Sequence, residues 1–591
     1  MLRQRLNDLR RLAAVLLPAL AAAGPAWAAD PTPTQPTTRP STQPAAHWHY
    51  RLTLAPPAEK RVEIAAHIAG LDPVPGELVL TMNTDYAYAR PPEPLLTGPP
   101  TVRAASRALA VTRRDPYTWV VTTEGQADLE LSYSVPLTHR DLESVRAAHD
   151  EFEFPFVAAD HALLGTGPLI IYPRDVRATT IGMQVVAPDG WDVQAPWPRA
   201  PEMEMQFVVP SVAALSNDLI AVGRWNRHEI RVGEFVGTVL FAPGQESIEA
   251  DVVKPIGAIV EHELALFGRP PAGRYLFVFG PPMMGATGGS PKTHSMVLAG
   301  DPRLLTQGTA RLGHLIAHEF FHTWATAQAA LADEVRFINE GFTDYYAYLV
   351  CARLGLTTWE EFAATLGDKM HRATYNAQFG KLSLVEAGGP LFFADAAARD
   401  LVYDGGLIVA AWLDRAIRTA GRGRSLDDFM RALLNDPHWD PEQRGPTIED
   451  FAALLPKFIH ESTARQIVAA VREPYRLNPV AALYPVGVFI HRDVDDPNLM
   501  NQVRLEGTRI VYIEPNGFAY RYGLREGDEL LEVAGTPVAT AEEVFAAWRG
   551  RLTEPLRVRL RRAGQEIEIE RLLPVITAFR VPVEPWRAHK D

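Results

Sequence analysis

The stretch HEFFHTW, His318 to Trp324, decides the fold of this chain, and FINEGFTDYY follows it at Phe337 to Tyr346. On a helix, residues four apart are offset by only about 40° and lie one turn apart. His318 and His322 can therefore direct their imidazoles at a single metal ion. Glu319 lies about 100° around the helix from His318, beside that ion, where a carboxylate can accept a proton. The alternative is an ordinary helix that carries two core or surface histidines.

The second stretch carries another pair of polar residues at helical spacing. Glu340 and Asp344 are four apart, so one carboxylate can bind the ion while the other holds a histidine N–H from behind. A solvated acidic face is the alternative, but Phe342, Tyr345 and Tyr346 crowd the same helix. The two pairs together predict a hydrolase with one zinc ion per chain, bound by three protein ligands and one open position.

His314 lies one turn before His318. A fourth protein ligand would fill the position that catalysis needs. We therefore expect His314 to be a neighbour of the site and not a ligand.

Length and composition set the class of protein. A chain of 591 residues is too long for one core and predicts three or four domains. With 47% hydrophobic and 22% charged residues it is globular. The formal charge of -13 and the absence of a basic stripe argue against a nucleic-acid partner. Cys351 is the single cysteine and cannot form an intrachain disulfide, so we expect it to be a buried apolar residue.

The N-terminus has the features of a secretory signal peptide over residues 1–28. A basic head is followed by the apolar run LAAVLLPALAAAG and by small residues before a cleavage point at Ala28. The run is too short to span a bilayer as a mature helix, although an uncleaved anchor is the alternative. We expect a secreted or periplasmic protein without a membrane anchor after cleavage. Residues 29–47 are rich in Pro and Thr and predict an extended linker.

The rest of the chain changes its periodicity twice, which predicts a multi-domain α+β protein. Residues 48–224 alternate polar and apolar positions in short runs separated by Pro and Gly, and predict an N-terminal β-rich domain. Residues 225–480 shift to helical spacing after GRYLFVFG. Within them, Gly355 and Gly421 are expected helix stops, and Ser425 with Asp428 resembles a capping box. Short strands return in residues 481–575, and residues 576–591 are expected to form a C-terminal tail.

The motifs resemble a known family. HExxH followed by an NEGF helix is similar to the gluzincin metallopeptidases. The wider pattern is most similar to PDZ-containing glycyl-aminopeptidase-like metallopeptidases. It is carried by HEFFHTW, NEGFTDYY, VYDGG with LDRAIRTAGRGRSLDDFMRALL, and a C-terminal PDZ-like module. The resemblance implies a thermolysin-like catalytic domain over residues 225–480 and a PDZ-like domain over residues 481–575.

The resemblance also implies a role for each matching residue. Zinc would be held by His318, His322 and Glu340, with Glu319 as general base and Asp344 supporting a ligand from behind. Tyr403, in VYDGG, would donate a hydrogen bond to the tetrahedral oxyanion. Without the family, Tyr403 would be an ordinary half-buried aromatic residue.

The chain departs from the family at one position. Where the family commonly has Gly-Gly-Leu-Glu-His, this chain has GGSPKTH, which places Pro291 at the position of a glutamate that pairs with the free substrate amine. Proline offers neither a charge nor an N–H. Glu151 or Glu153 could supply a substitute acid, or could be solvated residues of a strand edge. The following HSMVLAG, residues 294–300, is expected to be an edge strand that pairs with substrate, or a plain sheet strand.

The last module has its own signature. IEPNGFAYRYGLREGDELLEVAG, with Gly523, Leu524, Gly527 and Asp528, resembles that of PDZ domains. YPVGVFI, Tyr484 to Ile490, is the expected binding loop and strand for a terminal carboxylate or an extended peptide. His491, Arg492 and the following loop could cover this groove.

These patterns predict a secreted zinc-dependent metallopeptidase that acts on a peptide or protein substrate and is aminopeptidase-like. Two alternatives stay open. One is an endopeptidase without amine recognition, which Pro291 favours. The other is a non-catalytic, zinc-containing scaffold that binds peptides, against which the intact Glu319 and Tyr403 argue.

Overall fold

The computed structural model describes residues 44–83, 96–137, 155–200, 206–246, 249–268, 273–280, 288–299, 309–328, 332–421, 423–435, 445–474, 477–495, 503–513, 518–548, 555–572 and 576–587. The expected signal peptide, most of the expected linker, and Glu151 and Glu153 lie outside these residues. Among the described helices, none combines the length and the apolar character that crossing a membrane requires.

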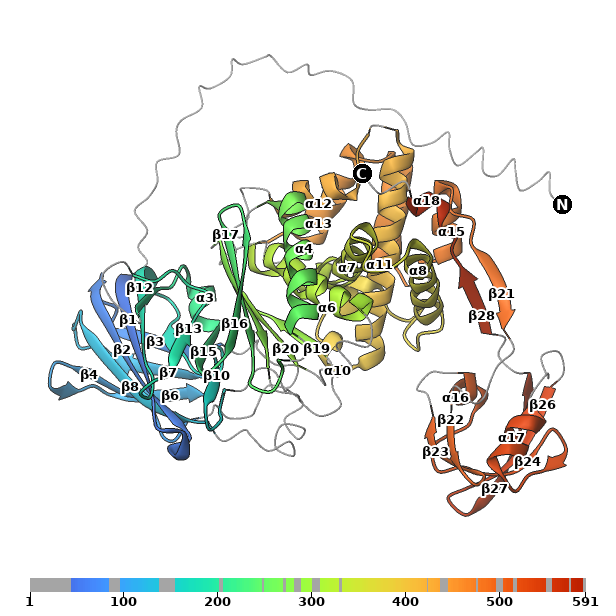
Figure 1. Ribbon diagram of the computed structural model, residues 1–591, viewed down its shortest axis with the longest axis horizontal. Helices are drawn as coiled ribbons and strands as arrows, with labels where there is room; N and C mark the ends of the chain where they lie inside the picture. Colours follow the sequence, from blue (N-terminus) through green and yellow to red (C-terminus); the bar gives the residue numbers. More distant parts are fainter. Residues whose placement is uncertain are drawn as a thin grey trace, which may run out of the picture. The chain divides into compact units, whose positions relative to one another are not determined.

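The N-terminal region is built from three sheets, which agrees with the expected β-rich domain (Figure 1). In the largest, β1 (Ala45–Leu54) pairs in parallel with β12 (Arg177–Val186) and antiparallel with β2 (Arg61–Asp72). Alternate residues of β1 are buried because successive side chains of a strand point to opposite faces. The strand begins at Ala45, so it takes up the last residues of the expected linker.

The remaining strands of this region complete the three sheets. The seven-stranded sheet has the order β14-β12-β1-β2-β8-β4-β5, and the two four-stranded sheets have the orders β13-β15-β10-β9 and β11-β3-β7-β6. Their bounds are β3 Glu77–Met82, β4 Thr101–Ala104, β5 Arg107–Ala108, β6 Val111–Asp115, β7 Thr118–Thr122, β8 Leu129–Pro136, β9 Phe156–Val157, β10 His161–Gly165, β11 Ile171–Pro173, β13 Asp192–Gln194, β14 Gln206–Val208 and β15 Leu219–Gly223.

A five-stranded sheet begins after β15 and carries one edge of the site described below. Its order is β16-β17-β18-β20-β19, with bounds β16 Asn226–Val232, β17 Phe235–Phe241, β18 Arg274–Phe279, β19 Gly288–Pro291 and β20 Ser295–Ala299. The expectation that HSMVLAG forms an edge strand is wrong, because β20 lies between β18 and β19. The edge strand is β19, which folds back antiparallel on β20.

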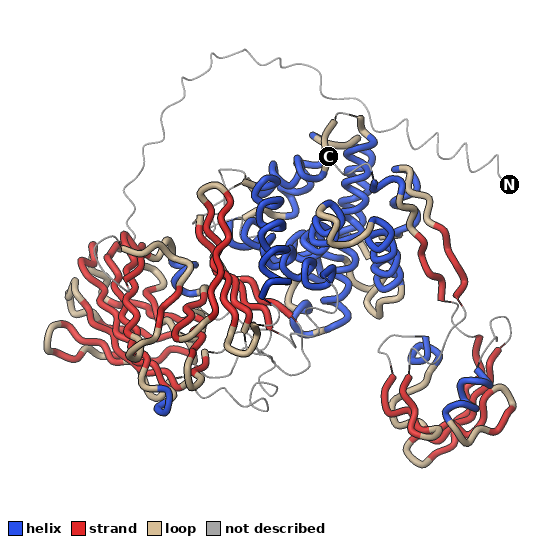
Figure 2. Tube along the Cα trace, in the orientation of Figure 1, coloured by secondary structure: helices blue, strands red, loops and turns tan. Residues whose placement is uncertain are grey.

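Helices follow the sheet, and the change from strand to helix is visible in Figure 2. The larger ones are α4 Glu249–Phe267, α6 Thr309–His322, α7 Thr343–Arg353, α8 Trp359–Thr374, α11 Ala396–Thr419, α12 Leu426–Leu434, α13 Ile448–Leu454 and α14 Glu461–Arg472. Gly355 and Gly421 have the positive φ expected of helix stops. Ser425 and Asp428 form the expected capping box at the start of α12.

One apolar core joins the five-stranded sheet to these helices. It contains aromatic residues of α6 and α7 such as Phe320, Phe321 and Tyr345, all fully buried. Each fully buried side chain of this size contributes about 1.5–3 kcal/mol relative to an exposed one. The core therefore fixes which face of α6 and α7 points away from it.

The C-terminal part differs from the expected domain boundaries. Val486 and Val488 belong to the large apolar core described above, and Tyr484–Val486 is a turn of 3-10 helix and not a binding strand of a PDZ-like domain. The segment after residue 575 is not a loose tail, because β28 (Ile576–Arg580) pairs with β21 (His491–Asp495) and Trp586 is buried in the same core. Burial of the apolar side chains of Val486, Val488 and Trp586 in the large core removes apolar surface from water, which stabilises this arrangement.

A separate small module therefore lies between β21 and β28 in the sequence. Its sheet has the order β22-β23-β24-β26-β27 and its own apolar core. The bounds are β22 Val503–Glu506, β23 Arg509–Ile513, α16 Phe518–Tyr522, β24 Glu529–Val533, β25 Thr536–Pro537, α17 Ala541–Trp548, β26 Pro555–Arg562 and β27 Gln565–Leu572. The signature residue Asp528 is buried, accepts a hydrogen bond from Arg525 N and pairs with Arg562.

The position of Trp586 predicts that the C-terminal segment stabilises the large apolar core. Its ring centroid lies 5.7 Å from that of Phe362 and 6.3 Å from that of Tyr345. Trp586→Ala should therefore lower the free energy of unfolding by about 3–5 kcal/mol, as truncation of buried tryptophan does. Urea unfolding measures this, with exposed Glu584→Ala as the matched control. Equal stability of the two variants would show that the segment is a tail after all.

Candidate metal centre

Helix α6 presents three polar side chains on the side that turns away from the core. His318, Glu319 and His322 are 7%, 6% and 4% exposed. Phe320 and Phe321, between them in the sequence, are fully buried in the apolar core. Rotation of the helix about its axis would expose these rings, so the core fixes the direction of the histidines.

Glu340 reaches the two histidines from the π-helical turn Phe337–Phe342, which leads into α7. This turn packs directly on α11, and a Cβ at Gly341 would overlap the backbone of Gly406. Two glycines therefore allow the backbones to approach closely. Tyr403 lies on α11 one turn before Gly406. The close packing of α11 on the π-helical turn therefore brings Tyr403 next to Glu340.

The three candidate ligand atoms form a small triangle. His318 Nε2 and His322 Nε2 lie 3.3 Å apart, and Glu340 Oε2 lies 3.5 Å from the first and 3.7 Å from the second. Ligands about 2.0–2.1 Å from a tetrahedral zinc ion are about 3.3 Å apart, so the residues fit this metal. The structure thus brings together the three ligands expected from the sequence.

Asp344 lies behind the triangle and orients a histidine. Its Oδ1 is 3.1 Å from His318 Nδ1 and 3.0 Å from His314 Nε2, and its Oδ2 accepts a hydrogen bond of 2.7 Å from Lys369 Nζ. Contact with Nδ1 leaves Nε2 of His318 for the metal. His314 points at Asp344 and stacks on Tyr348, so it is a neighbour of the site and not a member of the triangle.

Lys369 is a member of the site that the sequence did not indicate. It is 9% exposed on α8 and pairs with both Asp344 and Asp404, whose Oδ1 lies 3.1 Å from Nζ. Asp404 is itself fully buried and also pairs with Arg372. The signal for this was a lysine between Leu366 and Met370 on the apolar face of α8, a position where a cation needs a buried partner.

The pKa values of the ligands follow from burial and from these pairs. Burial raises the pKa of Glu340, but His322, His318 and a hydrogen bond with Tyr403 outweigh it and lower the pKa to about 2. Burial also raises the pKa of Asp344, and Lys369 and the histidines bring it well below its usual range. Both carboxylates are therefore ionised at neutral pH and attract a cation.

The two histidines shift in opposite directions. Burial lowers the pKa of His318, but its hydrogen bonds with Asp344 and Glu340 raise it to about 10. Burial lowers the pKa of His322 to about 4. The carboxylates that raise the pKa of His318 also attract a metal ion, and metal binding would release the proton of His318, because a proton and a metal ion compete for the same nitrogen electron pair.

Glu319 lies beside the triangle in an environment suited to proton transfer. Burial raises its pKa to about 7, and the charges of His318 and Lys292 act in the opposite direction. Its Oε2 is buried and has no hydrogen-bond partner among the described residues. A carboxylate with a pKa near the ambient pH can both accept and return a proton.

The edge strand β19 covers Glu319. A Cβ at Gly289 would lie 2.6 Å from Glu319 Cγ, so any larger residue at this position would displace the Glu319 side chain. Pro291 lies two residues further along the strand and brings no carboxylate to the site. The next residue, Lys292, donates a hydrogen bond of 3.0 Å to Ser290 Oγ.

Tyr403 is half-buried on α11, as its sequence position suggested. Its ring centroid lies 6.0 Å from that of His318, with an angle of 21° between the ring planes. It also hydrogen-bonds Glu340, which places its hydroxyl beside the ligand triangle.

Comparison with known proteins identifies two segments of the chain. Residues 49–218 match the Peptidase M61 N-terminal domain, and residues 311–389 match the M61 glycyl aminopeptidase family. The second match contains the HExxH stretch, Glu340 and Asp344, whereas Tyr403 lies beyond it. No curated protein sequence matches the chain.

Solved structures share the fold at low sequence identity. An aminopeptidase N family protein from Idiomarina loihiensis has 16% identity and a TM-score of 0.73, over 91% of this chain and 98% of that one. A variant of an M1 zinc metallopeptidase from Deinococcus radiodurans, bound to a Tyr-Ser-Ala substrate, has 15% identity and a TM-score of 0.50 over 74% and 96%. The chain therefore carries Peptidase M61 segments on an aminopeptidase N-like fold.

The ligand triangle predicts one zinc site that depends on His322. Purified protein should hold about one zinc ion per chain, and His322→Ala should lose it because a histidine and a carboxylate alone bind zinc weakly. Metal analysis after dialysis measures the content. His314→Gln is the matched control and should keep its zinc, since His314 is not in the triangle. Full zinc occupancy in His322→Ala would rule out the assignment.

Proposed function

We propose that this chain is a secreted or periplasmic zinc-dependent peptidase, aminopeptidase-like in its fold and in its catalytic residues. The observation that carries the proposal is the triangle of His318, His322 and Glu340 with the buried carboxylate of Glu319 beside it. The Peptidase M61 segments of the chain support the reaction class. The signal-peptide features of residues 1–28 support export.

Zinc, when bound, supplies a Lewis acid that polarises the substrate carbonyl and activates water. Glu319 accepts the proton of the attacking water and then returns it to the leaving amine. Burial raises the pKa of Glu319, which makes its carboxylate a stronger base than a solvated one. Burial of Glu319 keeps bulk water from competing for the proton.

Tyr403 is proposed to stabilise the negative charge that develops on the carbonyl oxygen. Its hydroxyl hydrogen-bonds Glu340 and so lies beside the ligand triangle, where a phenol can donate a hydrogen bond to that oxygen atom. Asp404, the next residue, is anchored by Lys369 and Arg372. These ion pairs hold α11 in place near the site.

A peptide is the proposed substrate. Strand β19 lies at the edge of its sheet and next to Glu319, and an edge strand can pair with an extended chain. The Deinococcus radiodurans protein binds a tripeptide on the same fold. For the small module of residues 503–572 we propose peptide binding on the basis of its PDZ-like signature, although not at Tyr484 to Ile490, which contributes to the catalytic core.

The role of Glu319 predicts a separation between catalysis and metal binding. Glu319→Gln keeps the shape of the side chain but removes the proton acceptor, so turnover of a peptide should fall by about 10² to 10⁴. Zinc content should not change, since Glu319 is not in the triangle. Peptide hydrolysis and metal analysis on the same samples test both statements. Activity close to that of the unsubstituted chain would refute the mechanism, and a chain that binds zinc and peptides without turnover would be a scaffold.

Pro291 favours a second candidate, an endopeptidase without recognition of the substrate amine. Acetylation of the N-terminus of a peptide should then change kcat/KM little. A strict aminopeptidase would leave a buried acid unpaired and lose about 10²-fold or more. Parallel assays of free and acetylated peptides decide between the two specificities. Abolished cleavage after acetylation would contradict the endopeptidase and establish amine recognition by other residues.

A further inference from the structure

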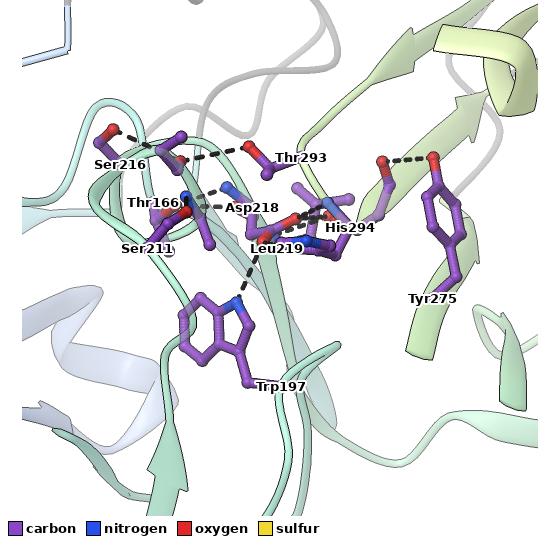
Figure 3. A network of polar contacts seen from close by, with 12 residues as sticks. Thr166, Trp197, Ser211, Ser216, Asp218, Leu219, Tyr275, Thr293 and His294 are labelled. Carbon is purple, nitrogen blue, oxygen red and sulfur yellow. Dashed lines mark hydrogen bonds and ion pairs between the residues drawn. The ribbon is translucent and has the colours of Figure 1, made fainter. Parts of the chain in front are cut away.

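A buried carboxylate of the N-terminal domain holds the hairpin that carries β19. Asp218, just before β15, is fully buried. Its Oδ1 accepts hydrogen bonds of 2.7 Å from His294 N and 2.7 Å from Ser295 Oγ, at the turn between β19 and β20 (Figure 3). Its Oδ2 accepts one of 3.0 Å from Trp197 Nε1 and lies 3.2 Å from His294 Nδ1. One side chain thus joins the two regions of the chain.

Further hydrogen bonds hold the backbone of Asp218 and of the turn in the N-terminal domain. Thr166 Oγ1 accepts a hydrogen bond from Asp218 N at 2.8 Å and lies 3.0 Å from Asp218 O. Thr293 N donates to Asn217 O at 2.9 Å, and Thr293 Oγ1 donates to Ala213 O at 3.2 Å. The tip of the hairpin is therefore seated in the N-terminal domain.

The chemistry of Asp218 makes this connection stiff. Hydrogen bonds to an ionised carboxylate are stronger than those between neutral groups. A buried carboxylate that loses its donors is also strongly unfavourable, because no water replaces them. Displacement of the turn would separate Asp218 from the His294 and Ser295 donors at once.

The position of the turn determines where strand β19 lies beside the candidate site. Lys292 N donates to Ser295 O at 2.7 Å and closes the turn. The register then pairs Pro291 with Met296 and Gly289 with Leu298. Gly289 lies in direct contact with Glu319, where a Cβ would be 2.6 Å from Cγ. A shift of the turn therefore moves β19 relative to the proposed base.

We infer that Asp218 is a positioning residue for peptide hydrolysis: it fixes the β19–β20 hairpin so that β19 stands at a defined place beside Glu319. This inference rests on the proposed function. It gives the N-terminal domain a part in the reaction, although the domain supplies no residue to the ligand triangle. A displacement of β19 by about 1 Å relative to Glu319 is enough to reduce turnover by about 10²-fold.

The test uses the zinc-loaded full chain with Asp218→Asn and Ser295→Ala. Both substitutions weaken or remove hydrogen bonds between Asp218 and the β19–β20 turn. We therefore expect kcat for a peptide to fall by about 10- to 100-fold, with zinc content unchanged. Amide hydrogen exchange of residues 288–299 should accelerate in both variants. Asp218 and Ser295 share one hydrogen bond, while Ser295 Oγ also accepts one of 3.1 Å from Leu219 N. The double variant should therefore lose less kcat than the product of the two single losses.

Trp197→Phe is the matched control. It removes a donor to Asp218 from within the N-terminal domain and leaves the hairpin bonds in place, so it should lower stability while kcat stays within about threefold. A merely structural role of Asp218 would make all three variants lose activity in proportion to stability, and that result would overturn the inference. Unchanged kcat and exchange in Asp218→Asn would also overturn it.

Failure of the proposed function gives a different result. If the unsubstituted chain binds zinc but hydrolyses no peptide, the peptidase assignment is wrong and the positioning role falls with it, whatever the exchange rates show. If it hydrolyses peptides and Asp218→Asn hydrolyses them equally fast, the assignment stands and only the inference fails. Should Asp218→Asn not fold, Ser295→Ala carries the comparison with Trp197→Phe.

Discussion

The ion pair between Lys369 and Asp344 is the interaction on which the candidate metal centre depends. A carboxylate in the apolar core is stable only when its charge is compensated, and Lys369 supplies that charge from another helix. With its charge balanced, Asp344 can hold the ring of His318 in one orientation. The pair therefore ties α6, α7 and α8 together at the point where the ligands are needed. Asp404 extends the same network to α11, which carries Tyr403.

Local patterns in the sequence predicted much of the helical region. The spacing of His318 and His322 is a property of a single helix, and the capping box of Ser425 and Asp428 involves residues three apart. Such features depend on the backbone geometry of one element and can be read without knowledge of the fold. The alternation of buried and exposed residues in β1 is of the same kind.

Contacts between distant segments could not be predicted in this way. Lys369 and Asp404 meet across two helices, and Asp218 meets His294 across 76 residues of sequence. The order of strands in the sheet, which makes β19 the edge in place of β20, also depends on pairing that leaves no local periodicity. The segment after residue 575 could not be placed for the same reason, since the aromatic partners of Trp586 lie far away in the sequence, in α7 and α8.

The burial of Trp586 has a consequence for how the small module can be removed. Strands β21 and β28 pair antiparallel, and the pair of Asp495 with Ile576 brings the two ends of the module together. The module between them has an apolar core of its own, as an inserted domain does. A short turn from Asp495 to Ile576 can therefore replace the module and keep β28 and Trp586 in place. Truncation after β21 would instead remove Trp586 and uncover Phe362 and Tyr345, so the module is separable by excision and not by truncation.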